Sequence, residues 1–396
     1  MYPGACIGGV SHGLFQSRSV VERENGREIL IRIPDEQFLY LRILRSESFT
    51  QDEVEFLAKF AKIVHDVAAR GNAPDVSNFS SRSIREAIAG VAMNGSKTFF
   101  NALELVQVWN DKAYEGRPIR TAYGFNPDAF EHTGIHLETF FRDDYGPVLS
   151  NGRDTLLEFT DKGFLVRHNS LSKESAAGFS PDVYSPVAAW AWGRRVALVT
   201  TEFRETLVFH ERRLAFARRR GQWHQISHDY VFDKLCQFDE MSSQLCNALH
   251  ETILDASFAH TGACISVMNR ARCRHEKRRT SDVTHEDEWL ASSKDRKARC
   301  FSSLIAGRPF FEIPRRLRQE LAALDGALIL DSDGIVRAVG AIVQIDPKAI
   351  GGGGRVAAAR TLAQFGLAVC ISCDGRVTGF SRIDDAAEPE AVFAFG

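Results

Sequence analysis

The spacing of apolar residues predicts helices in the first third of the chain. Apolar residues recur at helical intervals over residues 56–67 and would form one buried face. Thr50 and Glu53 precede them with the spacing of a capping box, and Phe49 and Val54 are placed to form a hydrophobic staple. Two further helices are predicted over residues 83–93 and 97–109, after a loop at 72–78.

The pattern changes to short β-type stretches between about residues 117 and 223. Apolar and β-branched residues predict strands here at 123–125, 156–160, 196–200, 206–209 and 214–217, and one earlier strand, before the first helix, at 28–33. The last two read as a hairpin that turns at residues 210–213. Residues 170–181 are mostly polar, which favours a flexible loop.

From residue 231 onward, helices and strands alternate. The pattern predicts a long helix at 232–258, a strand at 262–268, a charged surface segment at 269–299, a helix at 315–324, paired strands at 327–330 and 335–343 joined by a turn, a glycine loop and helix at 351–364, and a strand at 367–372. No stretch of the sequence repeats another. We therefore expect an α/β C-terminal domain, with a mixed sheet flanked by helices, and an α+β N-terminal region. The predicted divisions are 1–116 (mixed and helical), 117–230 (β-rich) and 231–396.

Composition narrows the class of protein. A chain of 396 residues exceeds one ordinary core, so two or three domains are expected. The hydrophobic fraction of 44% and the charged fraction of 25% are typical of soluble globular proteins. A net charge of -2 does not indicate nucleic acid or an anionic membrane as a partner.

Targeting signals and cysteine usage favour the cytoplasm. The first residues do not have the pattern of a signal peptide. No apolar run approaches the length of a membrane-spanning helix, and the run at 187–201 is interrupted by Arg194 and Arg195. The eight cysteines are scattered, which favours reduced thiols.

Two motifs in the last third carry candidate chemistry. Asp325-Gly326-Ala327 opens an apolar strand, and the glycines at 351–354 precede Arg355 and an alanine-rich helix start. A carboxylate can bind a divalent cation, and backbone N–H groups of a glycine loop at a helix N-terminus can approach phosphates. Taken alone, an Asp-Gly step is commonly a turn and a glycine run a flexible loop. Their ordered combination favours a nucleotide site.

The region 231–380 resembles the diadenylate cyclase (DAC) domain family, to which the DNA-integrity scanning protein belongs. The resemblance covers roughly two-fifths of the 396 residues. The family has an Asp-Gly-Ala motif on one strand, then a Thr-Arg-His motif after a glycine-bearing loop, then a strand ending in serine and acidic residues. Here the first motif is intact at 325–327, and the neighbouring family strands are matched at 261–265 and 338–343.

The resemblance implies a function and a site. It implies a nucleotidyltransferase that condenses two ATP into cyclic di-AMP or a related dinucleotide and releases pyrophosphate, with Mg²⁺ or Mn²⁺ as cofactor. It implies homo-oligomers, because each DAC domain carries half of a site. The implied catalytic residues are Asp325, also the metal ligand, and Arg355. The implied nucleotide-binding residues are Gly326, Ala327, Gly352, Gly353, Gly354 and Ser372.

Departures from the family motifs support an alternative. With Arg355 in the place of the family arginine, Gly354 replaces the threonine and Val356 the histidine. The strand-end acidic pair is half kept, as Ser372-Cys373-Asp374, and Leu324 stands where the family often has histidine. A catalytically degenerate nucleotide sensor is therefore the alternative to a cyclase. In either case the order of domains makes the N-terminal region a candidate sensor.

Three other groups of residues are interpreted without a ligand. Cys370 and Cys373 have CxxC spacing, but they lie on one predicted strand with no second pair. The histidines at 210, 224 and 228 are irregularly spaced and read as solvated. The arginines at 212, 213 and 218–220, near Trp223, read as a solvated strand face rather than a nucleic-acid surface.

Overall fold

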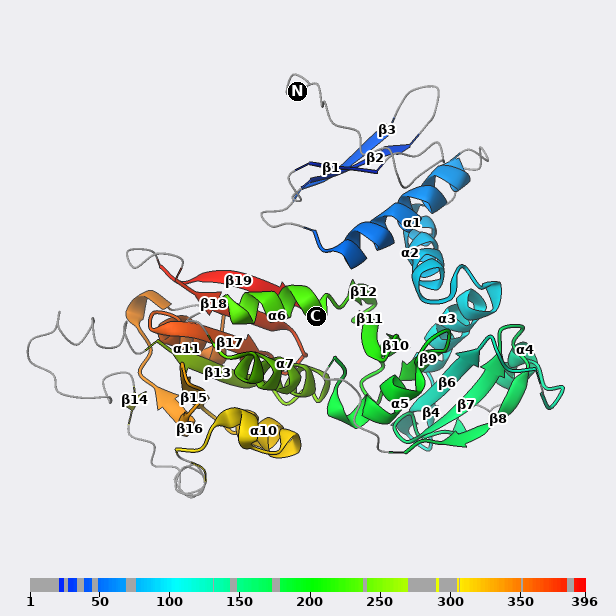
Figure 1. Cartoon of the computed structure of the whole chain (residues 1–396). Coiled ribbons are helices and arrows are strands. Elements are labelled where there is room, and N and C mark those ends of the chain that lie inside the picture. Colours follow the sequence, from blue (N-terminus) through cyan, green and yellow to red (C-terminus); the bar gives the residue numbers. More distant parts are fainter. Residues whose placement is uncertain are drawn as a thin grey trace, which may run out of the picture.

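The computed structural model describes a mixed α/β protein with two seven-stranded sheets flanked by helices (Figure 1). The described residues are 21–24, 28–33, 39–44, 49–68, 76–130, 132–142, 148–172, 179–237, 241–269, 290–291, 305, 307–349, 352–382 and 388–396. We call residues 76–225 the first unit and 228–396 the second. None of the helices in these ranges is long and apolar enough to cross a membrane.

A small sheet and one helix precede the first unit. The antiparallel sheet contains β1 (Val21–Glu24), β2 (Glu28–Ile33) and β3 (Leu39–Leu44), and helix α1 (Gln51–Ala68) lies against it. The predicted capping box is confirmed. The backbone N–H of Thr50 donates to the Glu53 carboxylate (2.7 Å), and the N–H of Glu53 donates to the Thr50 hydroxyl (3.3 Å). Phe49 is buried with Val54 packed against its cluster, as the staple predicts.

The first unit is built on one mixed sheet. Its helices are α2 (Val76–Met93), α3 (Lys97–Asn110), α4 (Leu137–Arg142) and α5 (Ser185–Trp190), with a 3-10 turn, η2 (Asp182–Tyr184). Its strands are β6 (Thr121–Asn126), β7 (Thr155–Thr160), β8 (Leu165–Ser170), β9 (Val196–Thr200), β10 (Thr206–His210), β11 (Arg213–Arg219) and β12 (Gln222–Gln225), beside the short pair β4 (Ala113–Tyr114) and β5 (Arg117–Pro118). The sheet order is β12-β11-β10-β9-β6-β7-β8, with only β6 and β7 parallel.

Alternating residues send the two faces of this sheet into different cores. In β9, Val196 and Leu198 pack under α2, α3 and α4, whereas Ala197 and Val199 pack under α5. The boundary predicted at residue 116 falls between α3 and the sheet that α3 covers. Helix α2 begins at Val76, so the loop predicted at 72–78 is wrong from that residue onward.

The second unit contains the other sheet. Its helices are α6 (His228–Cys236), α7 (Ser243–Phe258), α10 (Arg315–Ala322) and α11 (Gly354–Leu362), with 3-10 turns η3 (Phe310–Glu312) and η4 (Pro347–Ala349). Its strands are β13 (Ala263–Met268), β14 (Leu290–Ala291), β15 (Ala327–Asp331), β16 (Val336–Val343), β17 (Gly366–Ile371), β18 (Val377–Ser381) and β19 (Glu390–Phe395). The order is β14-β16-β15-β13-β17-β18-β19, with only β13 and β15 parallel.

The single long helix predicted at 232–258 is wrong. Two helices occupy this stretch, and α7 starts afresh at Ser243. The side chain of Ser242 caps α7 by accepting a hydrogen bond from the N–H of Leu245 (3.2 Å). The charged segment predicted at 269–299 lies outside the described residues except for Asn269 and β14.

The two units share one arrangement of six strands, to which β12 is added at one edge of the first sheet and β14 at the opposite edge of the second. In each, a central strand (β6 or β13) pairs in parallel with the next main strand (β7 or β15), which continues into a hairpin (β8 or β16). On its other side the central strand pairs antiparallel with β9 or β17, which begins a meander. The helices α3 and α4 cover one face as α7 and α10 do, and α5 and α11 cover the other.

The match extends to individual turn hydrogen bonds. In the first unit the N–H of Thr160 donates to Phe164 O (2.9 Å), and the N–H of Thr201 donates to Glu205 O (3.0 Å). In the second unit Asp331 donates to Ile335 O (3.0 Å) and Ser372 to Arg376 O (2.9 Å). Both counterparts lie 171 positions later (331 against 160, 372 against 201). The sequence does not repeat, but the fold does.

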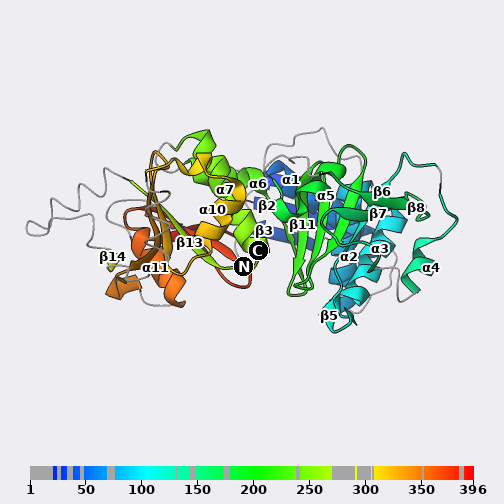
Figure 2. The same cartoon turned by 90° about the horizontal axis from the view of Figure 1, so that it is seen from below.

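Helix α7 connects the two units. Leu249 and Ile253 pack with the second sheet, whereas Leu254 and Phe258 pack with the first. Figures 1 and 2 show the units side by side, with α7 between the second sheet and the first unit. Burial of α7 on both sides makes it part of both cores.

A buried histidine pair lies at the same junction. His228 was expected to be solvated, but it is 2% exposed. Its Nε2–H donates to the carbonyl of Leu214 on β11 (2.7 Å), and its Nδ1 lies 3.3 Å from Nε2 of His250 on α7. Burial lowers the pKa of His228 to about 4, and it lowers the pKa of His250 well below its usual value. Both rings are therefore neutral at pH 7.

This pair predicts acid sensitivity. A histidine whose folded pKa is depressed contributes stability above its unfolded pKa of 6.5 and loses it as the pH falls toward about 4. Nearby Arg213 and Arg315 oppose the added charge. We expect the free energy of unfolding to fall by roughly 3 kcal/mol over this window through His228 alone. Denaturant unfolding at a series of pH values measures it.

The matched variants are His228→Gln and His168→Gln. The first keeps an N–H donor toward Leu214 and should flatten the pH dependence, and the second controls for loss of an exposed imidazole on β8. An unchanged slope in His228→Gln would show that another group carries the effect.

Candidate functional site

The predicted site residues gather at one edge of the second sheet. The parallel strands β13 and β15 both begin at this edge, and the antiparallel strand β17 ends there. Gly262, Asp325 and Ser372 stand just outside these three strand ends. Neighbouring strands lie about 4.8 Å apart, so Asp325 and Ser372 are separated by one strand, on the order of 10 Å.

A close backbone approach fixes the Asp-Gly-Ala turn. Gly326 has φ +101°, and a Cβ built there would lie 2.5 Å from the backbone carbon of Gly340 and 2.7 Å from the oxygen of Ala341 on β16. Only glycine fits this position without moving a backbone segment. Ala327, the next residue, is buried at the start of β15, while Asp325 is exposed. The turn therefore presents its carboxylate to solvent from a constrained backbone.

The glycine loop leads directly into α11. Gly352 and Gly353 have φ +80° and +89°, and the helix begins at Gly354. Gly353 is the N-cap and supplies no side-chain cap, so the first-turn N–H groups face no capping side chain. Gly351 lies outside the described residues. This arrangement fits an anion-binding helix start.

Arg355 lies on the first turn of α11 and reaches the end of β17. Its Nη1 donates to the sulfur of Cys373 (3.1 Å). A Cβ at Gly262, where φ is +65°, would lie 2.7 Å from the same Nη1. The guanidinium thus lies between the start of β13 and the turn after β17.

The turn after β17 is internally bonded. The hydroxyl of Ser372 donates to the Asp374 carboxylate, which also pairs with Arg220 of the first unit and with Arg376 (3.3 Å). Cys373 is exposed and Cys370 is buried, and both are free thiols. Ser372 is thus near Arg355, but its hydroxyl is already engaged within the turn.

The donor set fits a cation held mainly by a substrate. Across the described ranges, no three His, Cys, Asp or Glu side chains gather in a way that could hold a metal. Asp325 alone can supply one carboxylate, and Mg²⁺ is commonly bound by one or two carboxylates together with substrate phosphates. The residues present fit that mode and not an all-protein metal centre.

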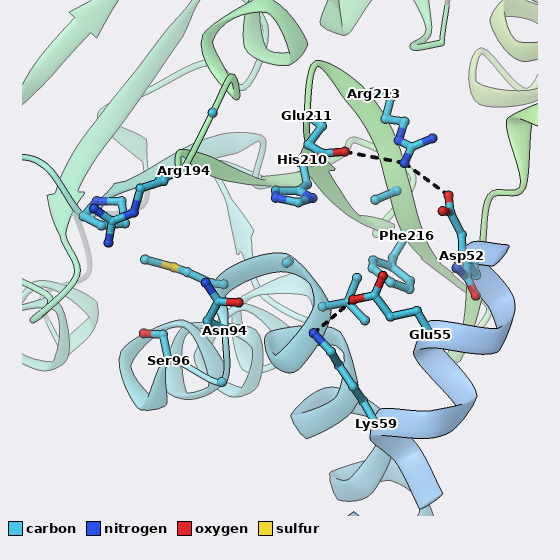
Figure 3. A pocket seen from close by; sticks show the side chains of 18 of the residues that line it. Asp52, Glu55, Lys59, Asn94, Ser96, Arg194, His210, Glu211, Arg213 and Phe216 are labelled. Atoms are coloured by element: carbon cyan, nitrogen blue, oxygen red, sulfur yellow. Dashed lines mark ion pairs between the residues drawn. The ribbon is translucent and has the colours of Figure 1, made fainter. Parts of the chain in front are cut away.

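A cavity of about 610 Å³ lies between helix α1, the turn after α2 and the β10–β11 hairpin, and no sequence pattern indicated it. His210, at the β10–β11 hairpin, and Asn94, in the turn after α2, lie on opposite walls (Figure 3). The wall toward α1 carries two ion pairs, Lys59–Glu55 (3.2 Å) and Arg213–Asp52 (3.1 Å). Burial lowers the pKa of His210. The sequence predicted the β10–β11 hairpin and the start of α1, which supply two walls of the cavity. Only the fold shows that these two elements face each other.

A second cavity, of about 900 Å³, lies at the edge of the first sheet that corresponds to the candidate site. Asp154, 171 positions before Asp325, lines it together with Phe203. The second unit closes it with α7 and α10, where Arg315 forks onto the buried Asp255 carboxylate with two contacts of 2.8 Å. Burial raises the pKa of Asp255, and the bonds from Arg315 oppose that rise.

Arg219 was expected on a solvated strand face and is instead buried, at 3% exposure. It pairs with the buried Glu205 at 2.7 Å and stacks over the ring of Phe258, 3.9 Å from its centroid. The signal available in the sequence was the alternation along β11, which puts Arg219 on the same face as the buried Ala217.

No protein-family model and no curated protein matches the chain.

Substitution of Gly326 tests the constraint on the Asp-Gly-Ala turn. We expect Gly326→Ala to lower the free energy of unfolding by about 2 kcal/mol or more, because its Cβ would meet backbone atoms at a positive φ. The control is Gly334→Ala, at the other end of β15, where φ is +78° and the Cβ meets only the side chain of Leu245 at 3.0 Å. That variant should lose about 1 kcal/mol. Equal losses in chemical denaturation would rule out the backbone contact as the cause.

Proposed function

We propose that the second unit is a DAC-like nucleotidyltransferase that condenses two ATP into cyclic di-AMP, or a related cyclic dinucleotide, and releases pyrophosphate. One observation carries the proposal: the Asp-Gly-Ala turn, the glycine-led start of α11 and the end of β17 converge at one sheet edge. These are the elements on which the resemblance to the DAC family was based. Their convergence supports a single nucleotide site.

Each residue has a role that its position supports. The exposed Asp325 carboxylate would bind the divalent cation, and Mg²⁺ or Mn²⁺ would neutralise phosphate charge when bound. The N–H groups at Gly353 and Gly354 and the guanidinium of Arg355 would hold phosphates. Gly326 and Ala327 would line the nucleotide, and Ser372 would contact base or phosphate after giving up its bond to Asp374.

The reaction needs two nucleotides in line. The 3′-hydroxyl of one ATP must approach the α-phosphate of the other opposite the leaving pyrophosphate, so catalysis is mostly positioning and charge neutralisation. An edge that binds one nucleotide supplies half of this arrangement. We therefore propose that two chains associate through their second units, at least during turnover.

A second candidate function is nucleotide binding without conversion. Gly354 and Val356 provide no polar side chain beside Arg355. Asp374, the remaining strand-end acid, is occupied by Arg220 and Arg376. These features favour a nucleotide sensor whose state is passed to the rest of the chain. In both versions the cavity of Figure 3 supports a sensory role for the N-terminal half, because it is a polar chamber lined by none of the proposed nucleotide-site residues.

Incubation with ATP and Mn²⁺, with products resolved by mass spectrometry, tests the proposal. We expect a cyclic dinucleotide and pyrophosphate from the wild-type protein, and a loss of at least about a hundredfold in Asp325→Ala, the scale for removing a group that stabilises transition-state charge. Asp333→Ala is the matched control, since Asp333 is an exposed aspartate at the opposite end of β15. It should retain wild-type turnover.

Calorimetry with ATP distinguishes the two functions. Binding without product would support the sensor, and neither binding nor product would reject the nucleotide site. Light scattering with and without ATP measures the proposed association of second units.

A further inference from the structure

Arg219 links the first unit to the edge of the proposed nucleotide site. Its Nη1 donates to Ser257 Oγ (2.9 Å) and to the carbonyl of Gly375 (3.0 Å), and its Nη2 donates to the carbonyl of Ser257 (3.0 Å). Ser257 lies in the last turn of α7, where a cation complements the helix dipole. The buried carboxylate of Glu205 balances its charge. Arg219 therefore joins β11, α7 and the β17–β18 turn.

The first unit holds this turn, residues 372–375, at three consecutive positions. His260 lies 3.2 Å from the carbonyl of Cys373 through Nδ1 and 3.0 Å from Glu205 through Nε2. Arg220 pairs with Asp374. Arg219 bonds Gly375, as above. These three contacts lead back to the first unit, directly or through Glu205, and Gly375 also accepts from Ser257 Oγ of α7 (2.5 Å), which is itself bonded by Arg219.

There is no free space between Arg219 and the turn. Gly375 has φ +84°, and a Cβ there would lie 2.7 Å from Nη2 of Arg219 and 2.7 Å from the carbonyl of Ser257. The corresponding turn of the first unit has Arg204 at φ +61° in this position, 171 residues earlier. The glycine is thus matched to the arginine packed on it and not to the turn alone.

We propose that the Glu205–Arg219 pair is a positioning element of the nucleotide site: it fixes the turn at 372–375, and through Cys373 it sets the place of Arg355. That the position of Arg355 matters for phosphate binding rests on the proposed function. Cys373 is itself one of the three held residues: its carbonyl lies 3.2 Å from His260 Nδ1, and its sulfur accepts from Arg355 at 3.1 Å. A shift of the turn therefore moves the partner of the phosphate-binding arginine.

Strand β11 also connects the Glu205–Arg219 pair to the cavity of Figure 3, so a ligand in that cavity could regulate the nucleotide site. β11 begins at Arg213, which lines the cavity of Figure 3 together with Phe216, and ends at Arg219. The strand spans about 20 Å at the usual rise per residue. A ligand that moves β11 at the cavity would therefore also move Arg219, the last residue of the same strand.

The test variant removes the Glu205–Arg219 pair without leaving either charge buried and unpaired. Arg219→Met alone would leave Glu205 buried and unpaired, which commonly unfolds a protein, whereas replacing both members of a buried pair by apolar residues of similar volume is often tolerated. The test variant is therefore Arg219→Met with Glu205→Met. The control is Arg218→Met, on the same strand and the opposite face.

Two readouts separate this proposal from the proposed function. The first is the alkylation rate of Cys373 by iodoacetamide, followed by peptide mapping, which needs no nucleotide. We expect the folded double variant to react about tenfold faster, the factor for one lost hydrogen bond of ~1.4 kcal/mol, and the control to react like wild type. Arg220→Ala, which removes only an exposed pair, should raise the rate about threefold.

The second readout is the Kd for ATP, which we expect to rise by a similar factor in the double variant. A folded double variant with wild-type Cys373 reactivity would overturn the positioning role, whatever the ATP result. If wild type binds no ATP, the proposed function fails, while Cys373 reactivity still decides whether the pair positions the turn. If the double variant does not fold, Arg219→Lys decides, because it keeps a cation beside Glu205 but loses the forked bonds to Ser257 and Gly375: a wild-type Cys373 rate there overturns the positioning role.

Discussion

The burial of α7 on two sides is the constraint on which the rest of the structure depends. A helix that is part of two cores cannot turn its polar groups to water, so they must find partners in whichever unit they face. Asp255 is satisfied by the forked contact from Arg315 and by the backbone N–H of Asp182 (2.7 Å). Ser257 is satisfied by Arg219. The junction is therefore held by buried, charge-assisted hydrogen bonds. Removing one partner of such a bond lowers the stability of the fold more than replacing both partners by apolar residues.

This constraint also locates the candidate site. β13 follows α7 after a short turn through His260 and Gly262, so the first strand of the site edge starts where the junction ends. Because Arg219 bonds both Ser257 and Gly375, the last strand of that edge is tied to the same point. A site built this way inherits the geometry of the contact between the units. Under the proposed function, this contact gives the N-terminal half a physical route to the nucleotide site.

The sequence predicted local structure well where the signal was local. The capping box at Thr50, the hairpin after Phe209 and the strand after Gly326 each depend on residues within a few positions, and each is confirmed. It could not predict what tertiary contacts decide. Arg219 and His228 are polar residues whose neighbours in the sequence are also polar. Their burial follows only from the packing of α7 against the first sheet. The order of residues along the chain predicts the glycine loop and Arg355. The contact between Arg355 and Cys373 cannot be predicted without knowing which strands are neighbours in the sheet.

The repeated fold also explains why the chemistry is assigned to the second unit. The counterpart of Asp325 is Asp154, which is bonded to Asn151 within its own loop. The counterpart of Gly326 is Thr155, whose Cβ excludes the close backbone approach made at Gly340. The first unit thus keeps the carboxylate but not the glycine that constrains the turn, and α5 begins with Ser185 and Pro186 where α11 begins after glycines. The same strand arrangement therefore carries the proposed nucleotide edge in one unit, and in the other unit it supplies Glu205 and Arg219, which contact the turn at 372–375.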